Sequence, residues 1–339
     1  MIKFFEPGKT YKKYEKEFDT EIKRVLSEGQ LILRKDVEDF EKTLASFVGT
    51  KYAVGLNSCT DALYLALRGL KIGIGDEVLV PSRTFVASAQ VIVQVGATPV
   101  YYDIDGNIEI TEKTKAIIPV HIEGAFGADM EKLVDECAKR EVYIIEDAAQ
   151  ALGATQNGRM AGSFGIAGCF SFYPAKILGA FGDAGALVTN DENMYNYVKD
   201  ARNHFKDDAR DWGVNSRLDN LQAVILNIRI KDIHKMLARR QEIAEIYQGG
   251  LKDLAWLKLP PHIEGRVWQD YIVQTEKRDE LYQYLKDNEC ETLKNNYPFP
   301  VPKLLGAQKY EDETLRLPCN ENLTNAEIEE VINLIKKFQ

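Results

Sequence analysis

Three short segments carry residue types that could bind an anion, pair with a positive charge or attack a carbonyl group. The first is Ser58-Cys59-Thr60-Asp61, which stands between an apolar run at 52–56 and the helical pattern ALYLALRGL. A helix that begins at the carboxyl end of a parallel strand points free backbone N–H groups at a ligand, and hydroxyl groups add donors for a phosphate. The same residue types also cap ordinary helices. The segment therefore predicts either an anion site or a plain cap.

The second segment is VYIIED, which ends in Asp147 and is followed by AAQALGA. Its apolar residues predict a buried strand, and ligands bind where such strands leave an open α/β sheet. A carboxylate held there could pair with a cationic ring nitrogen. The alternative is again a helix cap, because aspartate is common in that position.

The third segment places Lys176 in an almost charge-free stretch, CFSFYPAKILGAFGDAGALVTND. So little polarity around a lysine disfavours its ammonium form, and a neutral amine can attack a carbonyl. Most lysines are simply solvated, so this one is singled out by its surroundings. Together the three segments match the needs of pyridoxal phosphate (PLP), which are an anchor for the phosphate, a partner for the ring nitrogen and an amine for the aldehyde.

Composition limits the other classes. The chain has 339 residues and a net charge of −9, without a block of five like charges, which argues against a nucleic-acid-binding face. Five scattered cysteines without C-x-x-C spacing predict no zinc or redox pair and indicate a reducing, cytoplasmic chain. The beginning MIKFF predicts no secretion signal. The four histidines show no metal-ligand spacing, and GIG at 73–75 precedes a strand, so it predicts a turn and not a dinucleotide site.

Short apolar runs alternate with helical patterns from Tyr52 to Asn190, as a sheet buried on both faces requires. We therefore predict an α/β fold with a mostly parallel sheet. The uncharged stretch 84–102 has the length of a membrane span, but its polar residues and Pro99 predict a buried helix, a turn and a strand. The seven predicted strands are 52–56, 77–81, 98–103, 115–120, 142–147, 169–173 and 185–190.

The spacing of apolar residues also predicts structure before and after this sheet region. Residues 14–48 predict helices that cover the sheet, and 218–248 predicts one long connecting helix. Beyond it we expect a smaller α+β domain. Its predicted elements are strands at 256–260 and 269–275, a helix at 280–288, a turn at 297–302 and a helix from Asn325.

The chain resembles the DegT/StrS nucleotide-sugar aminotransferases, which are PLP-dependent enzymes of fold type I. The resemblance runs nearly end to end, and the combination is more specific than any single piece. The matching segments include FEKTLASFVGTKYAVGLNSCTDALYLAL, GIGDEVLVPSRTFVASAQVI, GATPVYYDID, VHIEGAFGADM, IIEDAAQALGA, SFYPAKILGAFGDAGALVTND, ARNHF, GVNSRLDNLQAVI and LPCNENLT. It implies a large PLP-binding domain at 1–235, with a seven-stranded sheet flanked by helices, and a small α+β domain at 236–339.

The resemblance also implies roles for single residues. Lys176 would be the Schiff-base lysine and Asp147 the partner of the pyridine nitrogen. Gln150 would contact the ring hydroxyl, Phe85 would stack on the ring, and Ser171 with the 58–61 turn would bind the phosphate. Because Lys176 is present, the dehydratase branch of the family, which has histidine there, is disfavoured.

One implied role concerns a second chain. Asn215, in GVNSRLDNLQA, resembles the asparagine that reaches the cofactor phosphate of the neighbouring subunit, so a homodimer with shared active sites is implied. Arg217 beside it would add a positive group near the phosphate or a nucleotide diphosphate, unless both residues merely cap the next helix.

The sequence departs from the family pattern at Cys59, where glycine is usual, and at Arg83 and Glu123, where uncharged residues or tyrosine are common. Arg83 and Glu123 are expected to line the substrate entrance. The segment YPFPVPKL lacks the histidines that are often found there.

We therefore expect an aminotransferase that moves an amino group from glutamate to a keto group of a nucleotide-linked sugar. Three alternatives remain open: a keto-cyclitol or small keto acid as acceptor, a regulatory protein that carries PLP without catalysis, and a nicotinamide oxidoreductase.

Overall fold

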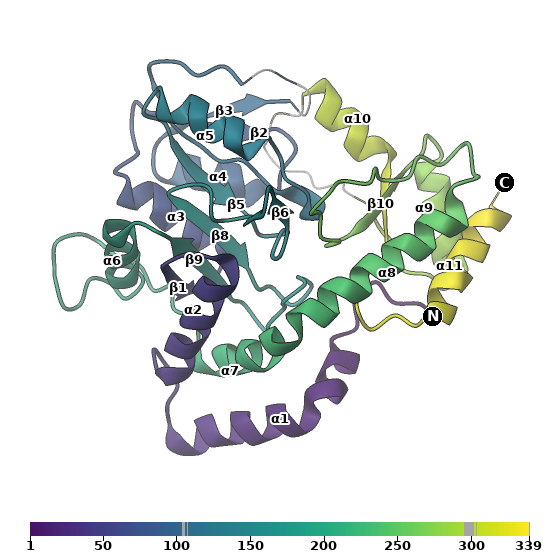
Figure 1. Cartoon of the computed structure of the whole chain (residues 1–339), viewed down its shortest axis with the longest axis horizontal. Helices are drawn as coiled ribbons and strands as arrows, with labels where there is room; N and C mark the ends of the chain where they lie inside the picture. Colours follow the sequence, from purple (N-terminus) through teal and green to yellow (C-terminus); the bar gives the residue numbers. More distant parts are fainter. Residues whose placement is uncertain (104–105, 107, 295–301, 303, 339) are drawn as a thin grey trace.

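A seven-stranded sheet forms the centre of the larger part of the molecule (Figure 1). The computed structural model describes residues 1–103, 106, 108–294, 302 and 304–338. In sheet order the strands are β1 (Tyr52–Leu56), β9 (Gly185–Thr189), β8 (Ala167–Ser171), β5 (Tyr143–Asp147), β4 (Thr114–Ile117), β2 (Glu77–Pro81) and β3 (Thr98–Tyr102). Only β9 of these seven runs against the rest. The predicted mostly parallel sheet is confirmed.

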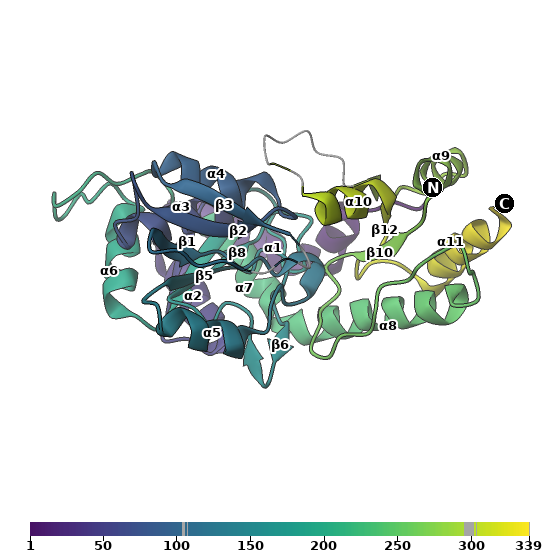
Figure 2. The same cartoon turned by 90° about the horizontal axis from the view of Figure 1, so that it is seen from above.

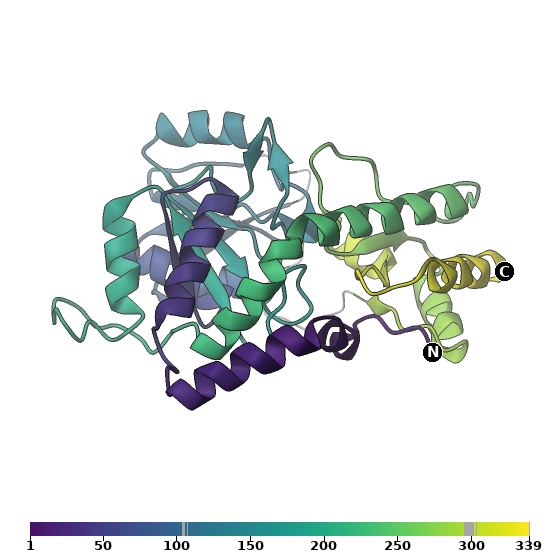
Figure 3. The ribbon, with the colours of Figure 1, turned by 60° about the horizontal axis from the view of Figure 1, so that its bottom comes forward.

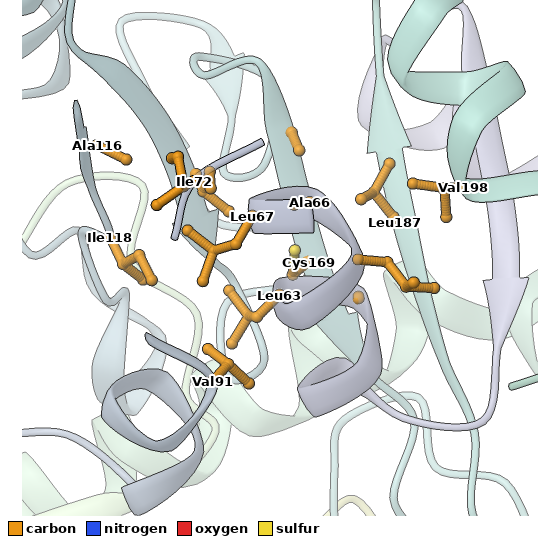
Figure 4. Close-up of a cluster of buried hydrophobic side chains, with 14 of the residues drawn as sticks. Leu63, Ala66, Leu67, Ile72, Val91, Ala116, Ile118, Cys169, Leu187 and Val198 are labelled. Carbon is orange, nitrogen blue, oxygen red and sulfur yellow. The ribbon is translucent and has the colours of Figure 1, made fainter. Parts of the chain in front are cut away.

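Helices cover both faces of this sheet because its side chains are apolar on both. Val54 and Leu56 of β1 face one core cluster, whereas Ala53, the residue before Val54, faces another. The first cluster is covered by α3 (Cys59–Gly69), α4 (Val86–Gln94) and α6 (Glu192–Ala201), and Figure 4 shows Leu63 and Leu67 of α3 within it. The opposite face is covered by α2 (Lys35–Val48), α5 (Met130–Ala138) and α7 (Asn220–Arg229).

The predicted strand at 115–120 is shorter in the structure. β4 ends at Ile117, because Pro119 has no N–H group to donate to a ladder. The chain still follows β5, since Val120 forms an isolated parallel bridge with Asp147. This bridge holds the backbone beside the predicted site.

The N-terminal helical region forms two helices with different partners. The second, α2, packs on β1 and α7, as expected for a helix that covers the sheet. The first, α1 (Pro7–Glu28), packs instead on α7, through Tyr14 and Phe18 against Ile225. It forms an outer layer along the molecule (Figure 3).

The prediction of one continuous helix at 218–248 is wrong, because the structure has two helices there. A 3-10 turn, η2 (Ile230–Asp232), separates α7 from α8 (Ile233–Leu251). Asp232 leaves helical geometry at this point and accepts a hydrogen bond from the Tyr14 hydroxyl (3.0 Å). The helix also continues through Gly250, where a Cβ would lie 2.7 Å from Ile332. Glycine leaves room there for the Ile332 side chain, because α11 packs closely on α8.

A second, smaller part of the chain packs around a three-stranded antiparallel sheet in the order β10-β12-β11. Figure 2 shows β10 and β12 of this sheet beside α10. Its elements are β10 (Tyr271–Gln274), α9 (Arg278–Asp287), β11 (Leu293–Lys294), α10 (Leu305–Glu313), β12 (Thr314–Leu317) and α11 (Asn325–Lys337). The predicted helix from Asn325 is confirmed, and Thr324 and Glu327 form its capping box. The predicted strand at 256–260 is wrong, because only Lys258 pairs with Gln274.

The predicted division between residues 235 and 236 falls within α8, which runs from one part into the other (Figure 1). Of the turn predicted at 297–302, residues 297–301 lie outside the described residues.

The remaining elements are short. They are η1 (Ile122–Gly124) and the hairpin β6 (Thr155–Gln156) and β7 (Arg159–Met160). The segment between α6 and α7 extends away from the body of the molecule (Figure 1), and Trp212 within it is 87 % exposed. Within the described ranges, the helices are too short or too polar to cross a bilayer.

Candidate active site

A cavity of about 830 Å³ lies where the two parts of the chain meet. Its wall includes the carboxyl ends of β5 and β8, the first turn of α3 and residues of the smaller part. Ten of the predicted site residues line it: Ser58, Cys59, Thr60, Arg83, Phe85, Glu123, Asp147, Gln150, Ser171 and Lys176. Asp61, Asn215 and Arg217 are not among the lining residues. The structure therefore brings most of the predicted site together.

Lys176 stands in a tight turn that several contacts hold. Its N–H donates to the Tyr173 carbonyl (2.8 Å), and a Cβ at Gly179 would collide with the Pro174 carbonyl, so the turn closes only with glycine there. Gln269 binds the backbone on both sides of the lysine, donating to the Ala175 carbonyl (3.0 Å) and accepting from the Ile177 N–H (3.1 Å). Sequence reasoning missed Gln269, which lies 93 positions beyond Lys176.

The electrostatic surroundings of Lys176 agree with a nucleophilic amine. Burial lowers the pKa of its amine, and the charges of Asp270 and Asp147 oppose that shift only in part. Loss of hydration disfavours the ammonium form, as the charge-free sequence context predicts.

Asp147 is 6 % exposed and its carboxylate is well supplied with donors. The Ser88 hydroxyl donates to Oδ2 (2.6 Å), and the Ala149 N–H donates to Oδ1 (3.2 Å). The Cys59 thiol lies 3.8 Å from Oδ1, and burial raises the thiol pKa, so the thiol keeps its proton and donates. Sequence reasoning missed Ser88. Its signal is a small hydroxyl residue within the apolar stretch FVASAQVIV.

The first turn of α3 lies in the cavity wall. Ser58 caps the helix by accepting from the Asp61 N–H (3.1 Å), so the cap raised by the sequence is present, and the same turn lines the cavity. A Cβ at Gly185 would collide with the Ser58 backbone, so glycine lets β9 pass directly behind this turn. Free N–H groups of a first turn stabilise a phosphate.

Asp61 has another partner. Its Oδ2 accepts from the Ser216 hydroxyl (2.6 Å), and Ser216 Oγ in turn accepts from the Asn57 N–H (3.2 Å). These bonds attach the Asn215–Arg217 segment to the start of α3. Asn215 is exposed, and Arg217 donates to Asn203 Oδ1 (3.0 Å) outside this cavity.

Gln150, Phe85 and Ser171 lie around the lysine and the aspartate. Gln150 Oε1 accepts from the Glu123 N–H (2.8 Å), and Ser171 Oγ accepts from the Tyr173 N–H (3.3 Å). Phe85 is 52 % exposed at the start of α4.

Arg83 and Glu123 form an ion pair in the cavity wall. The Tyr310 hydroxyl donates to both Glu123 carboxylate oxygens (3.1 and 3.0 Å), and the Arg83 guanidinium lies 3.6 Å from the centre of the Tyr310 ring. The two departures from the family pattern are thus partners of each other. Their pairing was not visible in the sequence, because 40 positions separate them.

A second ion pair in the cavity wall was also missed. Arg316 Nη1 donates to Asp270 Oδ2 (3.0 Å), and both residues come from the smaller part of the chain. The charges of both residues affect the Lys176 amine.

His121 and Glu146 form a buried pair behind the site (2.9 Å). Glu146 also accepts from the backbone N–H groups of Gly162, Phe164 and Gly165, which makes its role structural. No group of three potential metal ligands occurs in the described ranges.

A low-pKa lysine, a buried aspartate and a helix N-terminus around one cavity, on a mostly parallel seven-stranded sheet, define a PLP-dependent transferase of fold type I. The model of the DegT/DnrJ/EryC1/StrS aminotransferase family matches residues 12–336, and the chain belongs to that family. It is an aminotransferase that uses PLP, which removes the nicotinamide alternative.

Individual relatives agree. The chain is 37 % identical, over an alignment of 366 positions, to dTDP-3-amino-3,4,6-trideoxy-alpha-D-glucose transaminase of Streptomyces venezuelae, covering 99 % of this chain and 96 % of that one. It is 36 % identical over 337 residues to UDP-2-acetamido-2-deoxy-3-oxo-D-glucuronate aminotransferase of Pseudomonas aeruginosa, covering 95 % and 92 %.

Solved structures show the same likeness. DesV of S. venezuelae, in complex with a ketimine intermediate, superposes with a TM-score of 0.93 at 36 % identity, covering 99 % of this chain and 98 % of DesV. The PLP form of the putative sugar aminotransferase Spr1654 of Streptococcus pneumoniae superposes with a TM-score of 0.86 at 26 % identity, covering 95 % of each chain.

Proposed function

We propose that this aminotransferase moves an amino group from L-glutamate to a keto group of a nucleotide-linked sugar. The choice of a nucleotide-linked sugar as amino acceptor rests on the similarity, over nearly the whole chain, to transaminases named for dTDP- and UDP-linked sugars. The 830 Å³ cavity between the two parts of the chain supports it, since pockets for ligands of this size span several hundred Å³.

The residues of the cavity fit PLP. An amine whose pKa is lowered suits a covalent bond to an aldehyde, and a buried carboxylate suits a protonated ring nitrogen. The backbone N–H groups at the start of α3 suit a phosphate. When bound, PLP supplies the electron sink that makes loss of the donor's Cα proton feasible.

The chain's own groups then divide the work. Lys176 Nζ would hold the cofactor and would take and return the Cα proton of the donor. Asp147, oriented by Ser88, would stabilise the positive charge of the ring nitrogen. Gln150 would meet the ring hydroxyl, Phe85 would cover the ring face, and Ser171 would add a phosphate donor beside Ser58, Cys59 and Thr60.

A homodimer with shared sites is part of the proposal. Asn215 is exposed and outside its own chain's cavity, while Ser216 fixes the segment to α3. Such a segment is free to reach a partner's phosphate, with Arg217 adding positive charge. All five cysteines are buried and free, which supports the cytoplasm as the compartment.

The PLP-loaded protein tests the reaction in two stages. L-Glutamate should bleach the cofactor's visible absorbance and yield 2-oxoglutarate. The resulting protein is then offered dTDP-, UDP- and GDP-linked keto sugars, and mass spectrometry detects the amino sugar. Amination of only keto-cyclitols or small keto acids would reject the sugar, and no reaction with glutamate would favour the regulatory alternative.

Mixing two inactive variants tests the shared site. Lys176→Ala and Asn215→Ala chains that exchange subunits should give hybrid dimers with one intact site, so activity should partly return. A fully active monomer, or no recovery on mixing when both parents are impaired, would reject shared sites.

A further inference from the structure

The ion pair of Arg83 and Glu123 lies at the junction of the two parts of the chain. Arg83 follows β2, Glu123 lies in η1, and Tyr310 lies on α10 of the smaller part. The Tyr310 ring covers Arg83, and its hydroxyl donates to Glu123. The two charged side chains are only 15 % and 8 % exposed, and both line the cavity that contains Lys176. The pair is therefore held in place, largely shielded from bulk water, and accessible from the cavity.

The order of the sheet places this pair on the far side of Asp147 from the helix start at Ser58. At the carboxyl edge of the sheet, the Ser58 turn follows β1 and Asp147 ends β5. Glu123 and Arg83 follow the next two strands, β4 and β2. The Glu123 N–H also donates to Gln150, which is proposed to meet the ring hydroxyl of the cofactor. With the phosphate at Ser58 and the ring nitrogen at Asp147, the pair lies on the hydroxyl side of the ring.

The hydroxyl side of the ring is close to the reacting centre. In PLP the ring hydroxyl is on the carbon next to the one that carries the aldehyde, and the transferred amine is later held at that same group. The keto carbon of the acceptor must meet this amine. Substituents on the two carbons next to the keto carbon therefore come within reach of protein groups on the hydroxyl side, where Arg83 and Glu123 lie.

A hydroxyl group is the substituent that suits this pair. The bond to Glu123 leaves from Arg83 Nη2, and a guanidinium carries further N–H donors on its other nitrogens. The carboxylate accepts but cannot donate, whereas a hydroxyl does both, so one hydroxyl can bind both partners at once. The opposite charges of the pair already balance each other. A C–H group at this position would displace water and leave the pair without a polar partner, which costs free energy.

We propose that Arg83 and Glu123 bind a hydroxyl group on a carbon next to the keto carbon of the acceptor, and so select keto sugars that retain this hydroxyl. The inference rests on the proposed nucleotide-sugar acceptor and deepens it, because it states which sugars are accepted. A site built around a substrate hydroxyl strongly rejects the analogue that lacks it, since the site's own polar groups then lose their partner. Tyr310 acts through Glu123 and is a positioning residue.

Acceptors that differ in one oxygen test this assignment. The parent is the nucleotide-linked keto sugar that the wild type aminates best, and each probe replaces one hydroxyl next to the keto carbon by hydrogen. For a dTDP-linked 3-keto-6-deoxyhexose, the probes are the 2-deoxy and 4-deoxy sugars. Single-turnover reactions of the protein preloaded with the amine by L-glutamate, followed by the return of visible absorbance, measure kcat/KM. The wild type should prefer the parent over one of the probes by about 10- to 100-fold.

The double variant Arg83→Gln/Glu123→Gln should reduce this preference to within about threefold. Both charges are removed together because loss of one alone leaves the other buried without a counter-charge, which can impair folding. Tyr310→Phe should lose part of the preference, because Glu123 loses a hydrogen bond that orients it. Lys132→Gln/Glu136→Gln is the matched control, since it removes an exposed ion pair on α5, and it should keep the preference. The glutamate half-reaction of each variant shows that it is folded and loaded.

Binding gives a second readout. Calorimetry with the PLP-loaded protein, which has no amine to transfer, should show the parent binding the wild type about tenfold or more tightly than the rejected probe, and the double variant binding both equally. Equal acceptance of the parent and all probes, a best acceptor without a hydroxyl next to the keto carbon, or an unchanged preference in the double variant overturns the assignment. A protein that reacts with glutamate but aminates no nucleotide-linked sugar instead refutes the proposed function, and this inference with it.

Discussion

Replacing Glu321 with glutamine should remove the central charge of a buried ionic network. The Glu321 carboxylate accepts from Arg229 and from Arg240, at 2.9 Å each, and the three side chains are only 4–10 % exposed. Arg229 also donates to the carbonyls of Ile177 and Gly179, in the turn that follows Lys176. The network therefore joins α7, α8 and the segment after β12 to the predicted catalytic turn.

The size of the effect follows from the burial of both cations. Glutamine keeps the volume and one acceptor oxygen but leaves two buried guanidinium groups without a counter-charge. Loss of one member of a buried pair costs about 3–5 kcal/mol in the free energy of unfolding. With an unfolding entropy of roughly 2.1 cal/mol/K per residue, that loss lowers Tm by about 4–7 °C for this chain.

Chemical denaturation and calorimetry of Glu321→Gln and the wild type measure this loss. Glu242→Gln is the matched control, since Glu242 is an exposed partner of Arg239 on the same helix α8, and exposed pairs contribute little. A loss of less than about 1 kcal/mol, or an equal loss in the control, would refute the reasoning that burial makes this network important.

The pH dependence supplies an independent check. Burial raises the pKa of Glu321, but the charges of Arg240 and Arg229 outweigh burial, and the net shift is downward. A carboxyl whose pKa is lowered by folding contributes stability above its ordinary pKa and loses it as the pH falls through the lowered value. The stability difference between wild type and Glu321→Gln should therefore shrink below about pH 4.

Three further outcomes test the site. Lys176→Ala should lose the covalently bound cofactor's absorbance and the glutamate half-reaction, and wild-type turnover would contradict its role. Ser88→Ala should slow that half-reaction roughly 10- to 100-fold because Asp147 loses a charge-assisted hydrogen bond, and Ser88→Thr should restore most of the rate; equal rates in all three proteins would exclude the contact. Gly185→Ala should weaken PLP binding, measured by absorbance titration, because its Cβ collides with the Ser58 backbone, whereas Gly249→Ala, with open space around it, serves as the unaffected control.

Features carried by a short stretch of chain could be predicted from the sequence. The apolar runs of the large sheet are local, because a strand buried on both faces must be apolar throughout. Lys176 and Asp147 stand out for the same reason, since each polar residue follows or interrupts an apolar segment. The capping box at Thr324 is likewise contained in four residues.

The break between α7 and α8 and the absence of a strand at 256–260 could not be predicted in this way. The helical pattern of the sequence continues through Ile230–Asp232. The break between the two helices coincides with a hydrogen bond from Tyr14 to Asp232, which only the structure shows. Residues 256–260 have the composition of a strand, but a strand also needs a neighbour that offers a ladder of donors and acceptors.

The sequence by itself thus determined the class of fold, the family and the central lysine and aspartate, because these depend on local composition and order. Only the tertiary structure decided that Ser88 supports Asp147, that Gln269 holds the Lys176 turn, and that Arg316 and Asp270 join the cavity wall. These contacts join residues 46 to 94 positions apart. Residues so far apart in the sequence become neighbours only when the sheet, α8 and the smaller part pack around one cavity. Hydrogen bonds and ion pairs depend on this distance in space and not on distance along the chain.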